Sequence, residues 1–315
     1  MKNIYSNIYS FNKIVLKKTV ETLKQGNLVG LPTETVYGLA GNAYSKKAVK
    51  KIFRLKARPK KNPLIVHYFS LKEARKDVIF NDEFLKLYKR LCPGPLTFVL
   101  MKKRKSKISP LVTANLNSVA IRFPKHKIVR SIIKSLNFPI AMPSANISSR
   151  LSPVTAEDVY EEFKNKLTTI INGGKAKIGI ESTVIDLTEK PKILRPGIIS
   201  ANEIKNFLKT NLSKKKNKIK SPGMLKKHYS PGIPLVMGKK PKKSSHAYIV
   251  FGKKFKNRRN YFNLSKKGHL KEAAANLYKI MRKIKNKGYK KIFVSKIPNQ
   301  GVGIAINDRL KRASR

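Results

Sequence analysis

The chain has 315 residues, 41% of them hydrophobic, which is enough to build the cores of two ordinary domains. Lysine and arginine number 71 against 16 acidic residues, a formal net charge of +55. So few carboxylates disfavour a paired-carboxylate glycosidase or a carboxylate metal cage, and the single cysteine, Cys92, excludes an internal disulfide and a multi-cysteine zinc site.

The distribution of charge and apolar residues bears on partners and location. Basic residues are spread along the whole chain together with many Asn and Ile, which favours a compositional bias over a dedicated nucleic-acid surface. Weak, non-specific RNA binding is still expected from the charge. The N-terminus lacks a continuous apolar core, and no apolar run reaches the roughly 18 residues of a membrane span. We therefore expect a cytoplasmic protein without membrane association.

The first predicted elements end in polar residues. The pattern predicts a helix over 12–25 and a strand over 28–31 that leads into the Thr-Glu-Thr of 33–35. Ser45 is expected to cap a helix that ends at Pro59, and a strand follows over 64–67. Lys56 and Arg58 lie just before Pro59, so two cations adjoin two strand ends. This corner suits a polyphosphate, although the helix dipole alone would also favour cations there.

The middle of the chain continues this alternation. A capping box at Ser70 and Glu73 predicts a short helix, and Thr155 with Asp158 predicts a second capped helix. Candidate site residues lie at the ends of three predicted strands. Arg122 is near the end of one strand, Pro-Ser-Ala-Asn (143–146) follows the end of another, and Glu181-Ser182-Thr183 begins a third. The remaining elements predicted here are helices over 82–91, 128–133 and 201–208 and strands over 96–101, 118–123, 140–142 and 179–186.

Beyond residue 208 the composition changes. Residues 209–220 are Lys-rich and aperiodic, typical of a linker, whereas 221–234 (SPGMLKKHYSPGIP) holds Met224, His228 and Tyr229, which a spacer does not need. Strands over 235–237, 248–251 and 292–294 with helices over 270–284 and 303–313 predict a small α/β unit. The predicted fold is α/β: a catalytic domain over 1–208 with a large twisted mixed sheet and an open cleft, a linker or lid over 209–234, and a Rossmann-like C-terminal domain over 235–315.

The strand-end clusters supply hydroxyls, amides, one imidazole and several cations. GxSxG is absent, and no histidine adjoins Ser144 in sequence, so acyl-enzyme chemistry has little support. A site rich in cations and poor in nucleophiles suits phosphoryl or nucleotidyl transfer, in which the protein positions two substrates and neutralises charge.

Ordered motifs along most of the chain carry a family resemblance. They are PTETVYGL, KARP with NPLIVH, PGPLTFVL, SVAIRFP, PSAN, NGG with GIESTVID, LRPG, SPGM with HYSP, and GIAINDRLKRA. Together they resemble the threonylcarbamoyl-AMP synthase family, in its long form with a C-terminal domain. The resemblance implies synthesis of threonylcarbamoyl-adenylate from L-threonine, bicarbonate and ATP with release of pyrophosphate. A threonylcarbamoyl transferase complex would then modify the adenosine next to the tRNA anticodon.

The resemblance also implies site residues by matching motif positions. The threonine-binding positions correspond to Thr35, His67, Arg122, the Ala141 backbone and Ser182. The ATP-binding positions correspond to Arg58, Asn62, Ser118, Ser144, Ser152, Arg195 and Tyr229, with Lys56 and Asn146 completing the catalytic Lys-x-Arg and Ser-x-Asn signatures. ATP enters as a substrate, and no protein metal site is expected, because Mg²⁺ would be carried by the nucleotide. This sequence departs from the family pattern at Ser149, where a Gly is expected, and at Leu225 and Lys226 in the linker.

Two other functions remain open on sequence. An RNA-binding or ribosome-associated protein of the same fold would suit the charge, but it predicts aromatic residues interleaved with basic ones along a groove. A carbamoyl-adenylate-forming maturation enzyme would share the fold, but it would be expected to carry zinc-finger or acylphosphatase-like segments. Taken one at a time, His67 would usually be a strand-end histidine with its hydrogen bonds satisfied, Tyr37 a packing residue, and Ser118 and Ser152 ordinary strand and turn residues.

Overall fold

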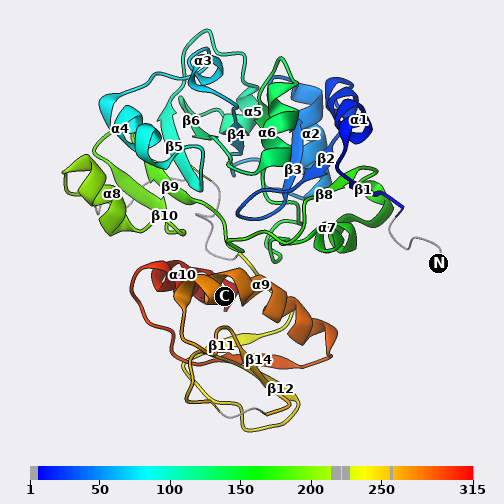
Figure 1. Cartoon of the computed structure of the whole chain (residues 1–315), viewed down its shortest axis with the longest axis vertical. Helices are drawn as coiled ribbons and strands as arrows, with labels where there is room; N and C mark the ends of the chain where they lie inside the picture. Colours follow the sequence, from blue (N-terminus) through cyan, green and yellow to red (C-terminus); the bar gives the residue numbers. More distant parts are fainter. Residues whose placement is uncertain (1–5, 214–220, 222–227, 256–257, 315) are drawn as a thin grey trace.

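The computed structural model describes residues 6–213, 221, 228–255 and 258–314. Half of the predicted linker 209–234, including Met224, Leu225 and Lys226, lies outside the described residues. Within the described part, no helix is both long and apolar enough to cross a membrane. The described residues form two sheets with their helices (Figure 1).

The larger sheet is mixed and has ten strands. Their bounds are β1 (Ile8–Ser10), β2 (Val29–Leu31), β3 (Gly38–Asn42), β4 (Ile65–His67), β5 (Leu96–Met101), β6 (Ser118–Arg122), β7 (Ile140–Ala141), β8 (Ile170–Asn172), β9 (Thr183–Asp186) and β10 (Lys192–Arg195). Their order across the sheet is β1-β8-β2-β3-β7-β4-β6-β5-β9-β10.

Helices cover both faces of this sheet because alternate strand residues are apolar on both sides. Leu39 and Ala40 of β3, for example, belong to different cores. On the Ala40 side lie α1 (Lys13–Lys24) and α6 (Lys127–Lys134), and on the Leu39 side lie α2 (Lys46–Leu55), α4 (Asp82–Leu91), α7 (Ala156–Phe163) and α8 (Ala201–Leu208). Short helical turns are α3 (Leu71–Ala74), α5 (Pro110–Thr113) and η1 (Lys164–Lys166).

Two of the predicted helix caps are confirmed and one is wrong in part. Ser45 accepts from the Ala48 N–H, and Thr155 forms a full capping box with Asp158. Ser70 makes no side-chain cap bond, although Glu73 accepts from the Phe69 N–H. The helix that Ser45 caps ends at Leu55 and not at Pro59. Ala57, two residues after Leu55, has a left-handed φ of 47°, and a residue in this conformation ends a helix.

Strand periodicity gathers the candidate residues on one face of the sheet. Ser118, Ala120 and Arg122 alternate along β6 with Val119 and Ile121, which are in the α2–α4 core. The neighbouring strands show the same alternation, and the parallel pair β4–β6 sets His67 directly opposite Arg122. Thr97 of β5 lies opposite Arg122 on its other side. The sheet therefore brings together side chains that are 25 to 55 residues apart in the sequence.

The smaller sheet follows the linker. Its strands are β11 (Leu235–Met237), β12 (His246–Val250), β13 (Tyr261–Asn263) and β14 (Lys291–Val294), all parallel, in the order β11-β14-β12-β13. Helices α9 (Leu270–Asn286) and α10 (Val302–Ala313) lie between this sheet and the larger one (Figure 1). The predicted combination of a large mixed sheet with a small Rossmann-like α/β unit is confirmed.

Candidate functional site

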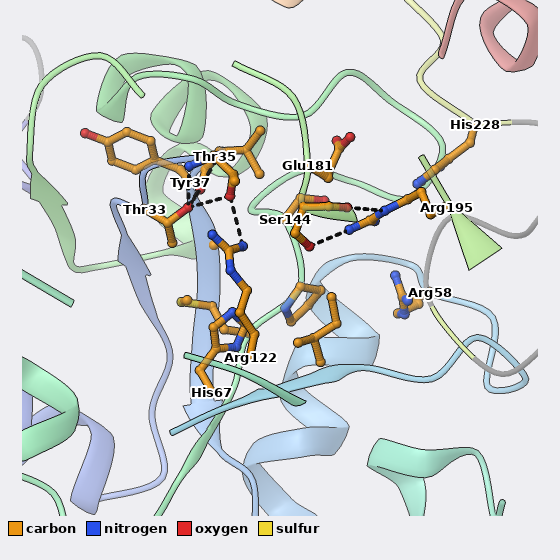
Figure 2. Close-up of a pocket in the computed structure, with 16 residues that line it drawn as sticks. Thr33, Thr35, Tyr37, Arg58, His67, Arg122, Ser144, Glu181, Arg195 and His228 are labelled. Carbon is orange, nitrogen blue, oxygen red and sulfur yellow. Dashed lines mark hydrogen bonds between the residues drawn. The ribbon is translucent and has the colours of Figure 1, made fainter. Parts of the chain in front are cut away.

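A small polar cavity lies where β4 and β6 end. Its free space is about 40 Å³, room for a few water molecules. The sequence predicts an open cleft here; the free space found is small, and His228, from the strip before the smaller sheet, also lines it. Figure 2 shows the lining: Thr33, Thr35, Val36, Tyr37, Gly38, Arg58, Ile65, His67, Arg122, Met142, Pro143, Ser144, Glu181, Ser182, Arg195 and His228.

Arg122 dominates one side of the cavity. Its Nη1 donates to Thr35 Oγ1 at 2.9 Å, its Nη2 to Glu34 Oε1 at 2.7 Å, and its Nε to the Gly94 carbonyl at 3.4 Å. Thr35 is held in turn by the Thr33 hydroxyl, 2.8 Å away. A guanidinium has five N–H donors, so these three bonds to described residues leave two N–H groups for a ligand. That is enough for a bidentate carboxylate.

Glu34 fixes the orientation of Arg122. Burial alone would raise the pKa of the Glu34 carboxyl, but the Arg122 charge and hydrogen bonds, with the Lys125 backbone N–H, hold that pKa below its usual range. The carboxylate is therefore ionised at neutral pH. Because it is already bound to Arg122, it serves to position that guanidinium and is a poor candidate for a proton-transferring base.

His67 presents a neutral imidazole to the cavity. The side chain is buried, and burial together with the nearby Arg122 charge keeps its pKa well below the usual value. Its Nδ1 atom is buried and has no hydrogen-bond partner among the described residues. A buried polar atom without a partner favours a ligand that would supply one.

Two further arginines form the opposite side (Figure 2). Arg195 donates from Nε to the Ser182 carbonyl at 3.1 Å and from Nη2 to Ser182 Oγ at 3.0 Å, while Ser182 Oγ also contacts Thr97 Oγ1 at 2.7 Å. Arg58 donates to the carbonyls of Asn62 and Pro63 at 2.9 and 2.7 Å. Burial and the like charge of Arg195 lower the pKa of Arg58, yet a guanidinium stays protonated at neutral pH. These two cations therefore favour an anionic ligand between them.

Lys56 lies behind the cavity and does not line it. The side chain is 1% exposed, and its Nζ donates to the Ser144 carbonyl at 2.6 Å and to the Asn146 carbonyl. Asn146 is also buried and donates from Nδ2 to the carbonyls of Ile147 and Arg150. Both residues thus shape the 144–150 turn, and Ser144 alone of this segment reaches the cavity.

Five other expected site residues are outside the lining. Ser118 is on the same strand and face as Arg122 but roughly 13 Å along it, at about 3.3 Å per residue. The Ala141 side chain packs in a core, so only its backbone could face a ligand. Asn62 orients Arg58 through its carbonyl, Ser152 donates to Glu181, and Tyr229 is fully buried between Tyr278 and Arg309.

Glu181 is the site residue to which the sequence analysis, although it named the Glu181-Ser182-Thr183 cluster, assigned no role. Its carboxylate accepts from Ser152 Oγ, from Tyr278 Oη at 3.1 Å and from Arg309 Nε at 3.1 Å. Burial would raise the pKa of Glu181, but Arg309 and Arg195 lower it to about 2. An acidic residue directly before Ser182, in a chain with 16 carboxylates, was the available signal. Thr33 and His228, which the sequence analysis noted without a ligand role, also line the cavity, as does Met142, which it did not name. Tyr37 both packs and lines the cavity, its hydroxyl donating to the Gly174 carbonyl at 2.8 Å.

The fold and the cavity define a two-part α/β protein with an arginine-lined polar cavity at the strand ends. A family model described as "Telomere recombination" (Sua5, YciO and YrdC) matches residues 21–197. A second model, described as "Threonylcarbamoyl-AMP synthase, C-terminal domain", matches residues 199–315. The chain belongs to the threonylcarbamoyl-AMP synthase family.

Individual relatives cover nearly the whole chain. The threonylcarbamoyl-AMP synthase of Pyrococcus abyssi is 37% identical, covering 93% of this chain and 92% of its own length. That of Bacillus subtilis is 35% identical, covering 97% and 94%. The crystal structure of P. abyssi Sua5 complexed with L-threonine matches with a TM-score of 0.89 at 34% identity, covering 98% of this chain and 97% of that one.

Proposed function

We propose that this protein makes threonylcarbamoyl-adenylate from L-threonine, bicarbonate and ATP. The observation that carries the proposal is the match to named threonylcarbamoyl-AMP synthases over both parts of the chain. The threonine amino group and bicarbonate combine to a carbamate with loss of water. A carbamate oxygen then attacks the α-phosphorus of ATP, and the bond to pyrophosphate breaks. The protein's part is to hold both substrates and to neutralise charge on the transferred group.

We assign the Arg122 side of the cavity to threonine and the Arg58–Arg195 side to ATP. The two unassigned Arg122 N–H groups suit the amino-acid carboxylate, and Thr35, His67, Ser182 and the Ala141 backbone surround that position. Arg58 and Arg195 suit the phosphates, with Ser144 beside them. Asn62, Ser118, Ser152 and Tyr229 would complete the ATP site, while Lys56 and Asn146 would act through the turn that they hold.

Mg²⁺ would bind through the nucleotide. The two carboxylates nearest the site, Glu34 and Glu181, are paired with Arg122 and Arg309, and no group of three metal-ligating side chains occurs among the described residues. The ion's chemistry would be to neutralise the phosphates of ATP. We therefore expect adenylate formation to stop in excess chelator and to return when Mg²⁺ is restored, and full activity in chelator would contradict this assignment.

ATP cannot enter the cavity as it stands. Nucleotide-sized ligands need pockets of roughly 300 Å³ or more, and this cavity holds about 40 Å³. We infer that residues 1–208 form the catalytic domain, that 235–315 form a second domain, and that the strip 209–234 acts as a lid between them. Opening would admit ATP, and closure would exclude water from a labile mixed anhydride.

The product would pass to a separate transferase complex that modifies tRNA. We also infer that the protein acts in the cytoplasm. The lone Cys92 suits a reducing compartment. The carbamoyl-adenylate alternative has no comparable support, because both halves of the chain match threonylcarbamoyl-AMP synthase or its C-terminal domain.

A pyrophosphate-release assay tests the activity. The purified chain is given ATP, Mg²⁺ and bicarbonate, with L-threonine or with L-serine, L-valine or no amino acid. We expect release to require L-threonine and bicarbonate together, and mass spectrometry to detect threonylcarbamoyl-adenylate. Release that ignores threonine would overturn the proposal and favour the carbamoyl-adenylate alternative.

A further inference from the structure

Among the described residues, no helix packs on one of the two faces of the smaller sheet. Helices α9 and α10 pack on the face formed by Ala247, Ile249, Ile292 and Val294, between this sheet and the larger one (Figure 1). Alternate residues therefore point to the opposite face, away from the catalytic cavity. A ligand bound there would not contact the reacting groups.

Aromatic residues form a row across that opposite face. Strand register sets Phe293 of β14 opposite Tyr248 of β12, and Tyr248 opposite Tyr261 of β13. Phe255, in the loop after β12, meets the Tyr248 ring edge-on at 5.9 Å between centroids. Tyr248 is 4% exposed and forms the floor, while Phe255, Tyr261 and Phe293 are each partly exposed.

Cations surround this row. Lys254 lies over the Phe255 ring, Arg258 over Tyr261 and Lys291 over Phe293, each 5.5 Å from the ring centroid. Tyr248, Phe255 and Tyr261 also line a hollow of about 570 Å³. The other described residues that line it are Gly238, Lys240, Lys254, Arg258, Ser295 and Lys296, and none of them is acidic.

The charge is concentrated in this part of the chain. Residues 235–315 hold 24 Lys and Arg against two acidic residues, Glu272 and Asp308, whereas residues 1–208 hold 39 against 14. Glu272 and Asp308 belong to α9 and α10, on the covered face. A genome-wide bias toward lysine would not by itself deplete acidic residues from one domain.

We propose that this aromatic–basic face, defined by Lys240, Lys254, Phe255, Arg258, Tyr261, Phe293 and Lys296, binds single-stranded RNA. Partly exposed rings offer stacking surfaces to unpaired bases, and the surrounding cations can neutralise the phosphates that link those bases. Base stacking and phosphate contact would suit DNA equally; the choice of RNA rests on the proposed function, whose product is destined for tRNA. The face lies on the far side of α9 and α10 from the cavity, so an RNA bound there would leave the reacting groups free.

The test uses the full-length protein and a fluorescent 12-nucleotide single-stranded RNA, followed by anisotropy at several salt concentrations. The charge variant is K240A/K254A/R258A. Its matched control is R104A/K105A/K107A, which removes three exposed cations from the basic loop 102–107, where no aromatic residue lies. We expect the charge variant to raise Kd at least tenfold and to reduce the salt slope by about two. The control should change Kd less than threefold.

A second variant separates stacking from charge. F255L/Y261L keeps every cation, so we expect Kd to rise about tenfold or more while the salt slope stays that of the unmodified chain. Equal losses in the charge variant and its control, or unchanged binding by F255L/Y261L, would overturn the proposal. Tighter binding of a single-stranded DNA of the same sequence, or of a duplex RNA, would overturn the choice of ligand.

Pyrophosphate release separates this inference from the proposed function. The face is on the far side of α9 and α10, so all three variants should retain threonine-dependent release. Retained release with unchanged RNA binding would contradict the RNA face alone. Absence of pyrophosphate release from the unmodified chain would contradict the proposed function, whether or not the chain binds RNA.

Discussion

Arg58 is more constrained than its position near a helix end indicates. It is 8% exposed, and its guanidinium bonds the carbonyls of Asn62 and Pro63. Substitution by alanine would therefore remove both a proposed phosphate ligand and the hydrogen bonds that hold the loop at residues 62 and 63. Arg58→Lys keeps the charge but loses the fork that makes both bonds. We expect kcat for pyrophosphate release to fall about 100-fold, the typical effect of losing one charge-stabilising donor.

The control for Arg58→Lys is an exposed cation of α2, the helix that precedes Arg58. Lys50 is exposed on α2 and touches no cavity residue, so Lys50→Ala should leave kcat within twofold. Circular dichroism should show the same helix content for both variants. Turnover by Arg58→Lys at the unmodified rate would remove Arg58 from the ATP site.

His67 makes the stability of the fold depend on pH. Its pKa is lowered in the folded state by burial and by Arg122, so the folded protein holds it neutral while the unfolded chain protonates it below about 6.5. Its contribution to stability is therefore present above that pH and is lost as pH falls. At pH 5 the loss amounts to about 2 kcal/mol.

His67→Gln removes this proton linkage. Urea unfolding gives the free energy of unfolding of both proteins at pH 7.5 and at pH 5. From the first pH to the second, the variant should gain about 2 kcal/mol of stability relative to the unmodified chain. His126 and His228 also have lowered pKa values and contribute the same sign, so both proteins should still lose stability in acid. Parallel curves for the two proteins would show that His67 is not held neutral.

At the scale of elements, β3 packs closely against residues 142–143 because Gly38 has no side chain. A Cβ at this position would lie 2.3 Å from Met142 Cγ and 3.3 Å from the Pro143 carbonyl oxygen. Gly38 also forms a bridge with Ser144, so the strand and the 142–144 turn that line the cavity touch directly. We expect Gly38→Ala to destabilise the fold by about 1–3 kcal/mol, since overpacking moves backbone.

A double variant identifies the cause of that loss. Met142→Ala opens space next to the new methyl group, so Gly38→Ala should cost less in a Met142→Ala background, a coupling measured by thermal unfolding. Additive losses would mean that the clash with Met142 is not the cause, and that the backbone near Pro143 has to be examined instead.

The helices and strands differ in how far they could be predicted from sequence. Helix caps at Ser45 and Thr155 could be predicted because the signal is local. The β3 strand was not predicted, because GLAGN reads as a glycine-rich turn and becomes a strand by pairing with β2 and β7. Short strands such as β1 and β10 were missed for the same reason: their partners are distant in sequence.

The site was predictable in part for a related reason. Arg58, His67, Arg122, Ser144, Ser182 and Arg195 stand at strand or helix ends, and the structure brings them to one cavity. Glu181 could be assigned no role from sequence, because its role depends on Arg309, 128 residues later, and on Tyr278, which only tertiary packing places beside it. The resemblance implies that Tyr229 reaches a nucleotide, which stays a prediction; in the structure its ring packs against Tyr278 and Arg309.

At the scale of the whole molecule, the two parts share a core. Val36, Leu151, Val154, Ala176 and Ile180 of the larger part pack with the buried residues of the smaller one. Leu208 of α8 is also buried. Cutting the chain after Asn206 would therefore expose apolar surface and remove a core residue, so a truncated protein is a poor test of the lid. Point variants at the interface test closure with the chain intact.

Arg309 is the residue best placed to hold the two parts together. It bonds Glu181 at 3.1 Å and the Pro196 carbonyl at 2.6 Å, and its guanidinium lies 5.3 Å from the Tyr229 ring centroid. The side chain is 1% exposed. Arg309→Met would leave Glu181 without its ion-pair partner, and breaking one side of a buried pair typically costs about 3–5 kcal/mol. The closed arrangement should lose that much relative to an open one.

We therefore expect Arg309→Met to open the protein while both parts remain folded. Limited proteolysis within 209–234 should become at least tenfold faster, and product should escape before closure, so pyrophosphate release would exceed recovered threonylcarbamoyl-adenylate because the anhydride meets water. Lys311→Met, on the exposed side of the same helix, is the control and should match the unmodified chain in both measurements. If Arg309→Met is cleaved no faster and returns one adenylate per pyrophosphate, the buried pair does not hold the closed state and the strip is only a tether.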